Sequence, residues 1–122
     1  MTTVMIVDDS NALREIIAKM LRDSGMEVIS AEDGVQALEK IEQVTQLDLV
    51  VLDIVMPNMN GYELCRQIKK NPKTQNIPVV MCSSKSEDFD RIWGIRQGAD
   101  AYISKPFRPE ELLSTIKQLL PR

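Results

Sequence analysis

The chain has 122 residues, of which 43% are hydrophobic and 27% are charged. This length fits one domain over residues 1–122, and the composition is typical of a globular protein rather than of a disordered, collagenous or membrane chain. The longest uncharged apolar run, Ile77 to Cys82, is far too short to cross a bilayer, and the chain does not open with the basic segment of a signal peptide. We therefore expect a cytoplasmic protein with no membrane insertion.

The charged and reactive residues exclude several classes of chemistry. A net charge of −3 supplies no global attraction for nucleic acid, so we expect no direct nucleic-acid binding. The chain contains no histidine, which excludes Ser-His-Asp and Cys-His catalysis, histidine-ligated zinc and a role as phosphohistidine donor. Cys65 and Cys82 form no CxxC motif and fall in stretches predicted to face the core, so we interpret them as buried thiols.

Short β-rich runs alternate with segments of helical apolar spacing along the whole chain. The predicted strands are Thr3–Val7, Glu27–Ala31, Asp48–Leu52, Pro78–Cys82 and Ala101–Ser104. The predicted helices are Asn11–Ser24, a segment capped by Asp33 that carries Leu38 and Ile41, a segment from Asn60 to Ile68, Glu87–Gln97 and Pro109–Leu120. This strict alternation favours a parallel sheet with helices on both faces, joined by right-handed crossovers.

The fourth predicted helix, Glu87–Gln97, has a short apolar stripe. Phe89, Ile92 and Ile95 recur at helical spacing, which predicts that they face the sheet. Trp93 lies off this stripe, on a predicted outer position, where it either contacts a partner protein or packs over a neighbouring helix.

Polar residues follow the predicted strands at the points where those strands end. Asp8 and Asp9 follow the first strand, Asp53 the third, Ser83 the fourth and Lys105 the fifth. In an open parallel sheet, ligands bind beyond the carboxyl ends of the strands. Each residue also has a plainer interpretation, since an Asp-Asp pair after a strand is often a solvated turn and Lys105 could form a simple salt bridge with Asp53. The alignment of all of them on one edge favours a functional site.

The three carboxylates constrain what this site can be. If the first and third strands are neighbours, Asp8, Asp9 and Asp53 would lie within about 5 Å of one another, and each pair would repel by about 3 kcal/mol at an effective dielectric near 20. A fold that keeps such a cluster binds a cation there or uses a carboxylate with a raised pKa. Because all the ligands are oxygen atoms, Mg²⁺ is favoured over zinc.

Four short motifs occur in a fixed order along the chain. They are Asp8-Asp9, then Asp53-Ile54-Val55-Met56-Pro57 with Gly61, then Ser83-Ser84, and finally Lys105-Pro106-Phe107. Together they resemble the receiver domain of two-component response regulators, over essentially the whole chain. The resemblance implies a flavodoxin-like, CheY-like (βα)5 fold, in which a five-stranded parallel doubly wound sheet has the strand order 2-1-3-4-5. It also implies a single receiver domain with no effector domain in this chain.

The resemblance implies a role for each residue at the strand ends. Asp53 would accept a phosphoryl group from a phosphohistidine of a sensor histidine kinase or phosphotransfer protein. Mg²⁺ would be held by Asp9, Asp53 and the backbone carbonyl of Val55, while Asp8 would act mainly through water and support the metal and Lys105. The chain would catalyse only its own phosphorylation and dephosphorylation, and would not otherwise be an enzyme.

The remaining roles concern the phosphoryl oxygens and the output. Lys105 and the Ser83 hydroxyl would each bind a phosphoryl oxygen, and the resemblance implies a cis peptide between Lys105 and Pro106. Phosphorylation would draw Ser83 toward the phosphoryl group and let Tyr102 fill the vacated space, changing the surface of the fourth helix, fifth strand and fifth helix. A downstream protein would bind that surface, which includes Trp93.

Three interpretations of the function follow. The first is a phosphorylation-activated signalling switch of a two-component phosphorelay, acting in chemotaxis or twitching motility, because the stretch 93–99 is similar to receivers of the PilH type. The second is a receiver-like interaction module that works without phosphorylation. The third is a receiver taken from a longer transcription regulator.

Overall fold

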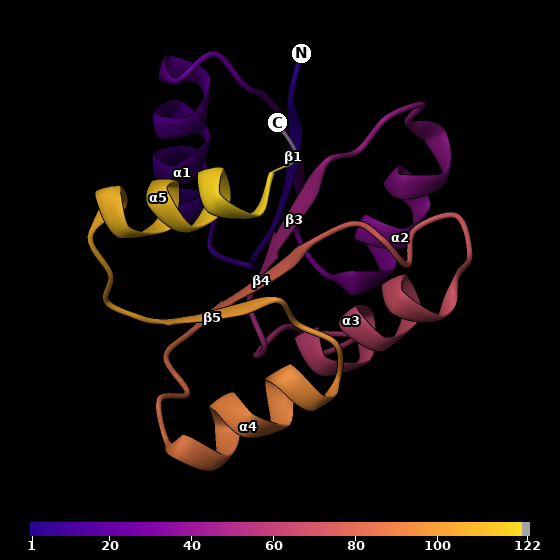
Figure 1. Ribbon diagram of the computed structural model, residues 1–122, viewed down its shortest axis with the longest axis vertical. Helices are drawn as coiled ribbons and strands as arrows, with labels where there is room; N and C mark the ends of the chain where they lie inside the picture. The colour runs from indigo at the N-terminus through magenta and orange to yellow at the C-terminus, as the bar shows by residue number, and fades with distance from the viewer. Residues whose placement is uncertain (121–122) are drawn as a thin grey trace.

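Five parallel strands form one sheet in the order β2-β1-β3-β4-β5, with five helices packed against it (Figure 1). The computed structural model describes residues 1–120. The strands are β1 (Thr3–Val7), β2 (Glu27–Ala31), β3 (Leu49–Leu52), β4 (Val79–Ser83) and β5 (Ala101–Ser104). The helices are α1 (Asn11–Asp23), α2 (Gly34–Gln43), α3 (Gly61–Lys70), α4 (Asp88–Arg96) and α5 (Pro109–Leu119). The predicted fold class and strand order are confirmed, and the predicted strand ends are correct to within one residue.

The helices cover both faces of the sheet and bury two apolar clusters. On one face, α1 and α5 bury Ile17, Leu21 and Ile116 against the sheet. On the other, α2 and α3 bury Ala37 and Leu64. The central strand β3 is buried along its whole length, as the continuous apolar run in its sequence predicts. This two-sided core fixes the strand ends relative to one another, which is the requirement for a site built from several strands.

The inward side of α4 differs from the prediction. Phe89, Ile92 and Ile95 are 70%, 54% and 47% exposed, so the prediction that this stripe faces the sheet is wrong. The buried residues of α4 are Asp90 and Gly94. A Cβ atom at Gly94 would lie 2.7 Å from the Met81 sulfur, so the helix lies too close to the sheet for a large side chain at that point.

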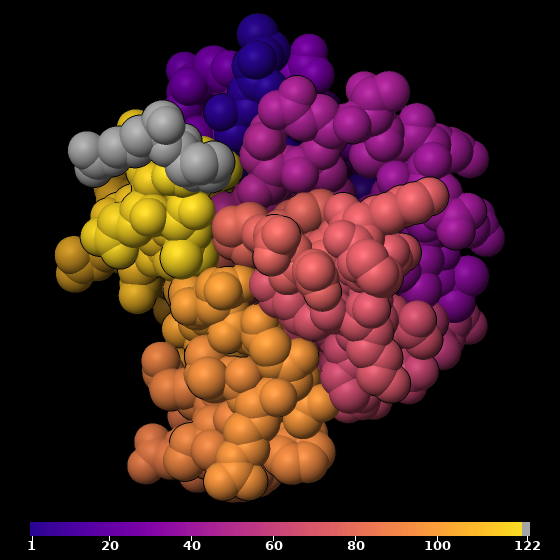
Figure 2. Space-filling view, turned by 45° about the vertical axis from the view of Figure 1, so that its right-hand side comes forward, coloured from indigo at the N-terminus to yellow at the C-terminus, as the bar shows by residue number. Residues whose placement is uncertain are grey.

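Several smaller predictions can be checked directly. Cys65 and Cys82 are both buried and free, as predicted. Trp93 of α4, the helix at the lower end of the molecule in Figure 2, is 48% exposed, and its contact with a partner protein stays a prediction. None of the helices in residues 1–120 is both long and apolar enough to cross a membrane.

Candidate functional site

Three carboxylates from two neighbouring strands converge at the carboxyl edge of the sheet. Asp8 and Asp9 follow β1 and Asp53 follows β3, and these two strands pair directly, with Val7 opposite Leu52. The Asp53 amide donates to the Val7 carbonyl at 2.9 Å, which ties the two strand ends together. One carboxylate oxygen from each aspartate lies within 4.8 Å of the others. The predicted cluster is therefore formed.

Lys105 points into the same cluster from the end of β5. Its ammonium donates to Asp8 Oδ2 at 2.8 Å and to Asp53 Oδ2 at 3.3 Å. Burial alone would lower the pKa of Lys105, but the hydrogen bond to Asp8 and the charges of Asp53 and Asp8 raise it above its usual value. The peptide between Lys105 and Pro106 is cis, as the resemblance implied. Lys105 therefore bridges two of the three carboxylates rather than forming a single salt bridge with Asp53.

The backbone around Asp53 is packed without spare room. Asp53 is buried, and its Oδ1 accepts a hydrogen bond from the Ile54 amide at 2.7 Å. The first residue of α3, Gly61, donates its amide to the Ile54 carbonyl at 2.8 Å. A Cβ atom at Gly61 would lie 2.1 Å from the Asp53 carbonyl oxygen, so only glycine fits there. The close start of α3 thereby fixes the segment that carries Asp53.

The donor set fits a hard divalent cation. All three candidate ligands are carboxylate oxygens. Mg²⁺ prefers oxygen ligands, whereas zinc prefers nitrogen and sulfur ligands, so this set suits Mg²⁺ better than zinc. Asp8 and Asp53 are buried while Asp9 is exposed, so the cluster has one side open to solvent. The Val55 side chain is exposed, and the role of its backbone carbonyl as a further ligand stays a prediction.

Ser83 is the last residue of β4, and Tyr102 lies within β5, three residues before Lys105. Ser83 is fully buried, and its hydroxyl oxygen accepts a hydrogen bond from the Lys85 amide at 3.3 Å. Tyr102 is also buried, and its hydroxyl donates to the Lys85 carbonyl. Burial, with the nearby groups of Tyr62 and Asp90, raises the pKa of Tyr102 to about 12. Both hydroxyls are thus bonded to Lys85 in this structure, and the movement of Ser83 and Tyr102 on phosphorylation stays a prediction.

Arg14 is a residue of this region that the sequence analysis did not identify. Its guanidinium donates to the backbone carbonyl of Asp8. A signal was present in the sequence, because Arg14 is three residues before Ile17 and seven before Leu21, on the apolar side of α1. A charged residue on a predicted inward face requires a polar partner there.

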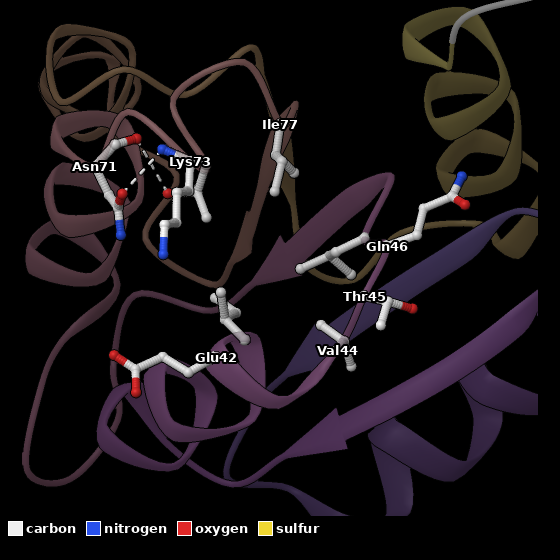
Figure 3. A pocket seen from close by; sticks show the side chains of 10 residues that line it. Glu42, Val44, Thr45, Gln46, Asn71, Lys73 and Ile77 are labelled. Carbon is white, nitrogen blue, oxygen red and sulfur yellow. Dashed lines mark hydrogen bonds between the residues drawn. The ribbon is translucent and has the colours of Figure 1, made fainter.

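A hollow lies at the opposite end of the strands from the acidic cluster. It is a groove of about 750 Å³ between the loops that precede β3 and β4 (Figure 3). Ile41, Leu47 and Ile77 supply its apolar lining, and Glu42 and Lys73 are charged residues in its wall. None of the site residues predicted from the sequence lines this groove. The chemistry predicted for the chain therefore belongs to the carboxyl edge.

Comparison with known proteins identifies the family. The family model of the response regulator receiver domain matches residues 4–117. The chain belongs to this family. It is 42% identical over 118 residues to protein PilG of Pseudomonas aeruginosa, covering 97% of this chain and 87% of that protein. It is 39% identical over 120 residues to protein PilH of the same organism, covering 98% of each.

Solved structures agree with this assignment. The chemotaxis response regulator CheY4 of Vibrio cholerae superimposes with a TM-score of 0.92 at 32% identity, covering 98% of this chain and 99% of that one. The response regulator TrrA of Thermotoga maritima, solved in complex with Mg²⁺-BeF, gives a TM-score of 0.86 at 32% identity, covering 98% of this chain and all of that one. By contrast, the chain spans about half the length of the transcriptional regulators it matches, such as 52% of PhoB of Pseudomonas aeruginosa.

Membership of the family gives the general activity. The chain is a CheY-like receiver domain of two-component signalling, a phosphorylation-activated switch. Receiver domains bind Mg²⁺ at an acidic pocket and interact with a phosphodonor and a downstream target. The acidic cluster described above is the group of residues that matches such a pocket.

Proposed function

We propose that Asp53 of this receiver accepts the phosphoryl group and that the Asp8, Asp9 and Lys105 side chains assemble the chemistry around it. The observation that carries this proposal is the convergence of the three carboxylates within 4.8 Å, with the Lys105 ammonium bonded to two of them. A carboxylate cluster with one bridging amine and an open side has the groups that phosphoryl transfer needs.

In the transfer step, an oxygen of the Asp53 carboxylate attacks phosphorus in a phosphohistidine of the donor protein. A P–O bond to Asp53 forms, the P–N bond breaks, and the imidazole leaves with the electron pair of the broken bond. Asp9 and Asp53 with the Val55 carbonyl would hold Mg²⁺, and Asp8 would orient it through water. Bound there, the ion would offset the negative charge that builds up as a carboxylate approaches a phosphoryl group.

The neighbouring polar groups bind the transferred phosphoryl oxygens. Lys105 turns part of its hydrogen bonding from Asp8 and Asp53 to one phosphoryl oxygen, and Ser83 releases the Lys85 amide to donate its hydroxyl to another. Hydrolysis of the acyl phosphate by water restores Asp53. The chain therefore catalyses its own phosphorylation and dephosphorylation and acts on no separate substrate.

The output of this switch is a change in the surface made by α4, β5 and α5. Phosphorylation pulls Ser83 away from Lys85, and Lys85 also accepts the hydrogen bond of Tyr102, so the two hydroxyls are coupled through one residue. Arg91 of α4 lies 5.5 Å from the centre of the Tyr102 ring, which carries the change to α4. Trp93, two residues further along, then contacts the downstream protein.

The partners in this proposal are proteins of a motility pathway. The donor is a sensor histidine kinase or phosphotransfer protein, because the chain has no histidine of its own. The similarity to PilG, PilH and the chemotaxis protein CheY4 supports a role in chemotaxis or twitching motility. The exchange takes place in the cytoplasm, and neither direct nucleic-acid binding nor membrane insertion is part of it.

Labelling with acetyl phosphate tests the phosphoacceptor. We expect intact-mass spectrometry to show a gain of one phosphoryl group in the presence of Mg²⁺ and no gain with a chelator. The Asp53→Asn variant should lose the label, whereas Asp23→Asn, at an exposed site on α1, should keep it. Label that persists in Asp53→Asn, or wild-type protein that gains none, would favour an interaction module that works without phosphorylation.

A further inference from the structure

A buried arginine lies next to the acidic cluster without a carboxylate partner of its own. Arg14 is 8% exposed and lies on the inner side of α1, beside Ile17 and Leu21. Among residues 1–120, no carboxylate oxygen lies within 4.0 Å of its guanidinium nitrogens. Burying a charge is costly unless hydrogen bonds replace its water, so the groups that Arg14 contacts must satisfy it.

Those groups lie in the turn that carries two of the site carboxylates and in the first residue of α1, which follows that turn. Arg14 Nη1 donates to the backbone carbonyl of Asp8 at 2.5 Å, and Nη2 donates to Asn11 Oδ1 at 3.0 Å. The Arg14 amide also donates to the Ser10 carbonyl at 3.0 Å. That last bond is the first backbone hydrogen bond of α1 and does not need the arginine side chain, so the side chain itself holds the turn at the Asp8 carbonyl and ties it to Asn11 at the start of α1.

The Asp8 carbonyl is the point in this turn that controls the site. It belongs to the peptide between Asp8 and Asp9, so its direction sets how the backbone leaves β1 and where the next carboxylate is placed. The Asp8 side chain is held separately, by the Ser10 amide at 2.8 Å and by Lys105. Asp9 is exposed, and no side-chain hydrogen bond or ion pair of Asp9 is present in residues 1–120. The backbone is therefore what places Asp9.

We propose that Arg14 is a positioning residue of the acidic site, which holds the Asp8–Asp9 peptide so that both carboxylates face Asp53 and thereby raises the affinity for Mg²⁺. The proposal rests on the proposed function of the carboxylate cluster as a Mg²⁺ site. Arg14 does not contact the ion or the phosphoryl group in it. Its effect passes through the peptide that it holds.

The sign of the effect separates positioning from simple electrostatics. A guanidinium close to a cation site repels the cation, so loss of its charge alone would tighten Mg²⁺ binding. Loss of the hydrogen bond to the Asp8 carbonyl would instead let Asp9 move and weaken Mg²⁺ binding. Arg14→Met removes both the charge and the bond while keeping a long apolar stem, so the direction of the change in Kd shows which effect dominates.

Isothermal calorimetry of MgCl2 into the unphosphorylated chain, at one ionic strength, tests this proposal. We expect Arg14→Met to raise the Kd for Mg²⁺ by about tenfold, the lower end of the effect of groups that orient metal ligands. Arg14→Lys keeps the charge but loses the two-pronged donor, and we expect about a threefold rise. The control is Arg22→Met, an exposed arginine on the same helix with the same change of net charge, which should leave the Kd within about twofold.

A structural role for Arg14 is separated by measuring the fold independently. Thermal unfolding in a chelator gives the stability of each variant, and the titrations are run where circular dichroism shows each variant to be folded. If Arg14→Met does not fold, Arg14→Lys decides. If neither folds, Asn11→Ala, which removes the acceptor of Nη2 and leaves the guanidinium in place, should still raise the Kd by about fourfold, which exceeds the tolerance set for the Arg22→Met control.

The outcomes distinguish this proposal from the one on which it rests. A wild-type chain that binds no Mg²⁺ overturns the proposed metal site itself. A wild type that binds while the folded Arg14 variant binds equally well or more tightly leaves the metal site standing and overturns the role of Arg14. Weaker binding in the Arg14 variants, with Arg22→Met unchanged, supports it.

Discussion

Helices α4 and α5 flank the same strand, β5, yet they are held in opposite ways. α5 buries Leu112 and Ile116 in the apolar cluster that it shares with α1. α4 buries only Asp90 and Gly94 and exposes its large apolar side chains to solvent. A helix that is amphipathic toward the core owes its position to apolar burial. α4 must be held by other contacts.

The contacts that hold α4 are mostly polar. Glu87 and Asp90 form a reciprocal capping box at its start, and the Tyr62 hydroxyl donates to the Asp90 carbonyl at 3.4 Å. Arg91 donates to the Tyr102 carbonyl at 3.3 Å. These contacts remove less apolar surface from solvent than the packed face of α5 does. The exposed apolar residues of α4 therefore contribute little to folding, which leaves them available to the downstream protein in the proposed function.

The largest predicted difference between the two helices comes from matched isoleucine substitutions. Ile116→Ala on α5 removes a fully buried side chain and should lower the free energy of unfolding by about 3 kcal/mol. Ile92→Ala on α4 removes a side chain that is 54% exposed and should change it by no more than about 0.5 kcal/mol. Urea denaturation of both variants measures this. A loss of about 2 kcal/mol or more from Ile92→Ala would mean that α4 turns its apolar side inward in solution.

A methyl group at Gly94 should push α4 away from the sheet. The added Cβ would lie 2.7 Å from the Met81 sulfur and 3.1 Å from Cδ2 of Tyr102. Alanine has a better helix propensity than glycine by about 1 kcal/mol, whereas overpacking at this contact costs about 1–3 kcal/mol. We therefore expect Gly94→Ala to lower the free energy of unfolding by about 1 kcal/mol. It should also expose the Tyr102 ring, lowering the pKa of its hydroxyl from about 12 toward the usual 10.0, which NMR of labelled tyrosine detects.

Gly25→Ala provides the control for the Gly94 substitution. Gly25 has a φ of 85°, and a Cβ atom added there would meet no atom within 4 Å, so its substitution strains the backbone without touching Tyr102. We expect a comparable loss of stability and an unchanged Tyr102 titration. If Gly94→Ala also leaves the Tyr102 titration unchanged, α4 does not restrain the tyrosine, and the proposed route from Ser83 to α4 lacks its second step.

The fold and the centre of the site could be predicted because their signals are local. Each strand is a short apolar run, and Asp8, Asp53 and Lys105 directly follow such runs, so the parallel sheet brings them to one edge without further information. The order of the strands and the cis peptide at Lys105 came from the family resemblance. The strand ends, the strand order and the cis peptide do not depend on which face each helix turns toward the sheet.

What the sequence did not predict depends on packing between elements. The stripe of α4 has helical spacing, but the close approach that Gly94 allows turns it outward, and spacing alone does not contain that contact. The bond between Arg14 and the Asp8 carbonyl is likewise a tertiary contact to a backbone atom. The resemblance placed Tyr102 inward only after phosphorylation, and its burial before that step, with its hydroxyl on the Lys85 carbonyl, is another contact to a backbone atom.

The smallest predicted effect concerns the N-terminal cap of α2. This cap uses one carboxylate, Asp33, whereas the cap of α4 uses two. Asp33 accepts hydrogen bonds from the Gln36 amide and from Asn58 Nδ2, both at 2.8 Å, and these bonds lower its pKa below the usual 3.8. A carboxyl with a depressed pKa adds stability above its unfolded-state pKa, and this stability is lost as the pH falls through the lower folded-state value. The stability difference between wild type and Asp33→Asn should therefore be constant near neutral pH and shrink below pH 3.8.

The second hydrogen bond to Asp33 can be removed separately. Asn58 has a φ of 69°, which glycine adopts without strain, so Asn58→Gly deletes the side-chain donor and keeps the turn. Because the Gln36 amide makes the larger contribution to the depressed pKa, we expect Asn58→Gly to reduce the acid-dependent part of the stability and not to abolish it. Chemical denaturation at a series of acidic pH values measures both variants. A stability difference between wild type and Asp33→Asn that stays the same down to acid pH would mean that the Asp33 side chain caps α2 without a charge-dependent contribution to stability.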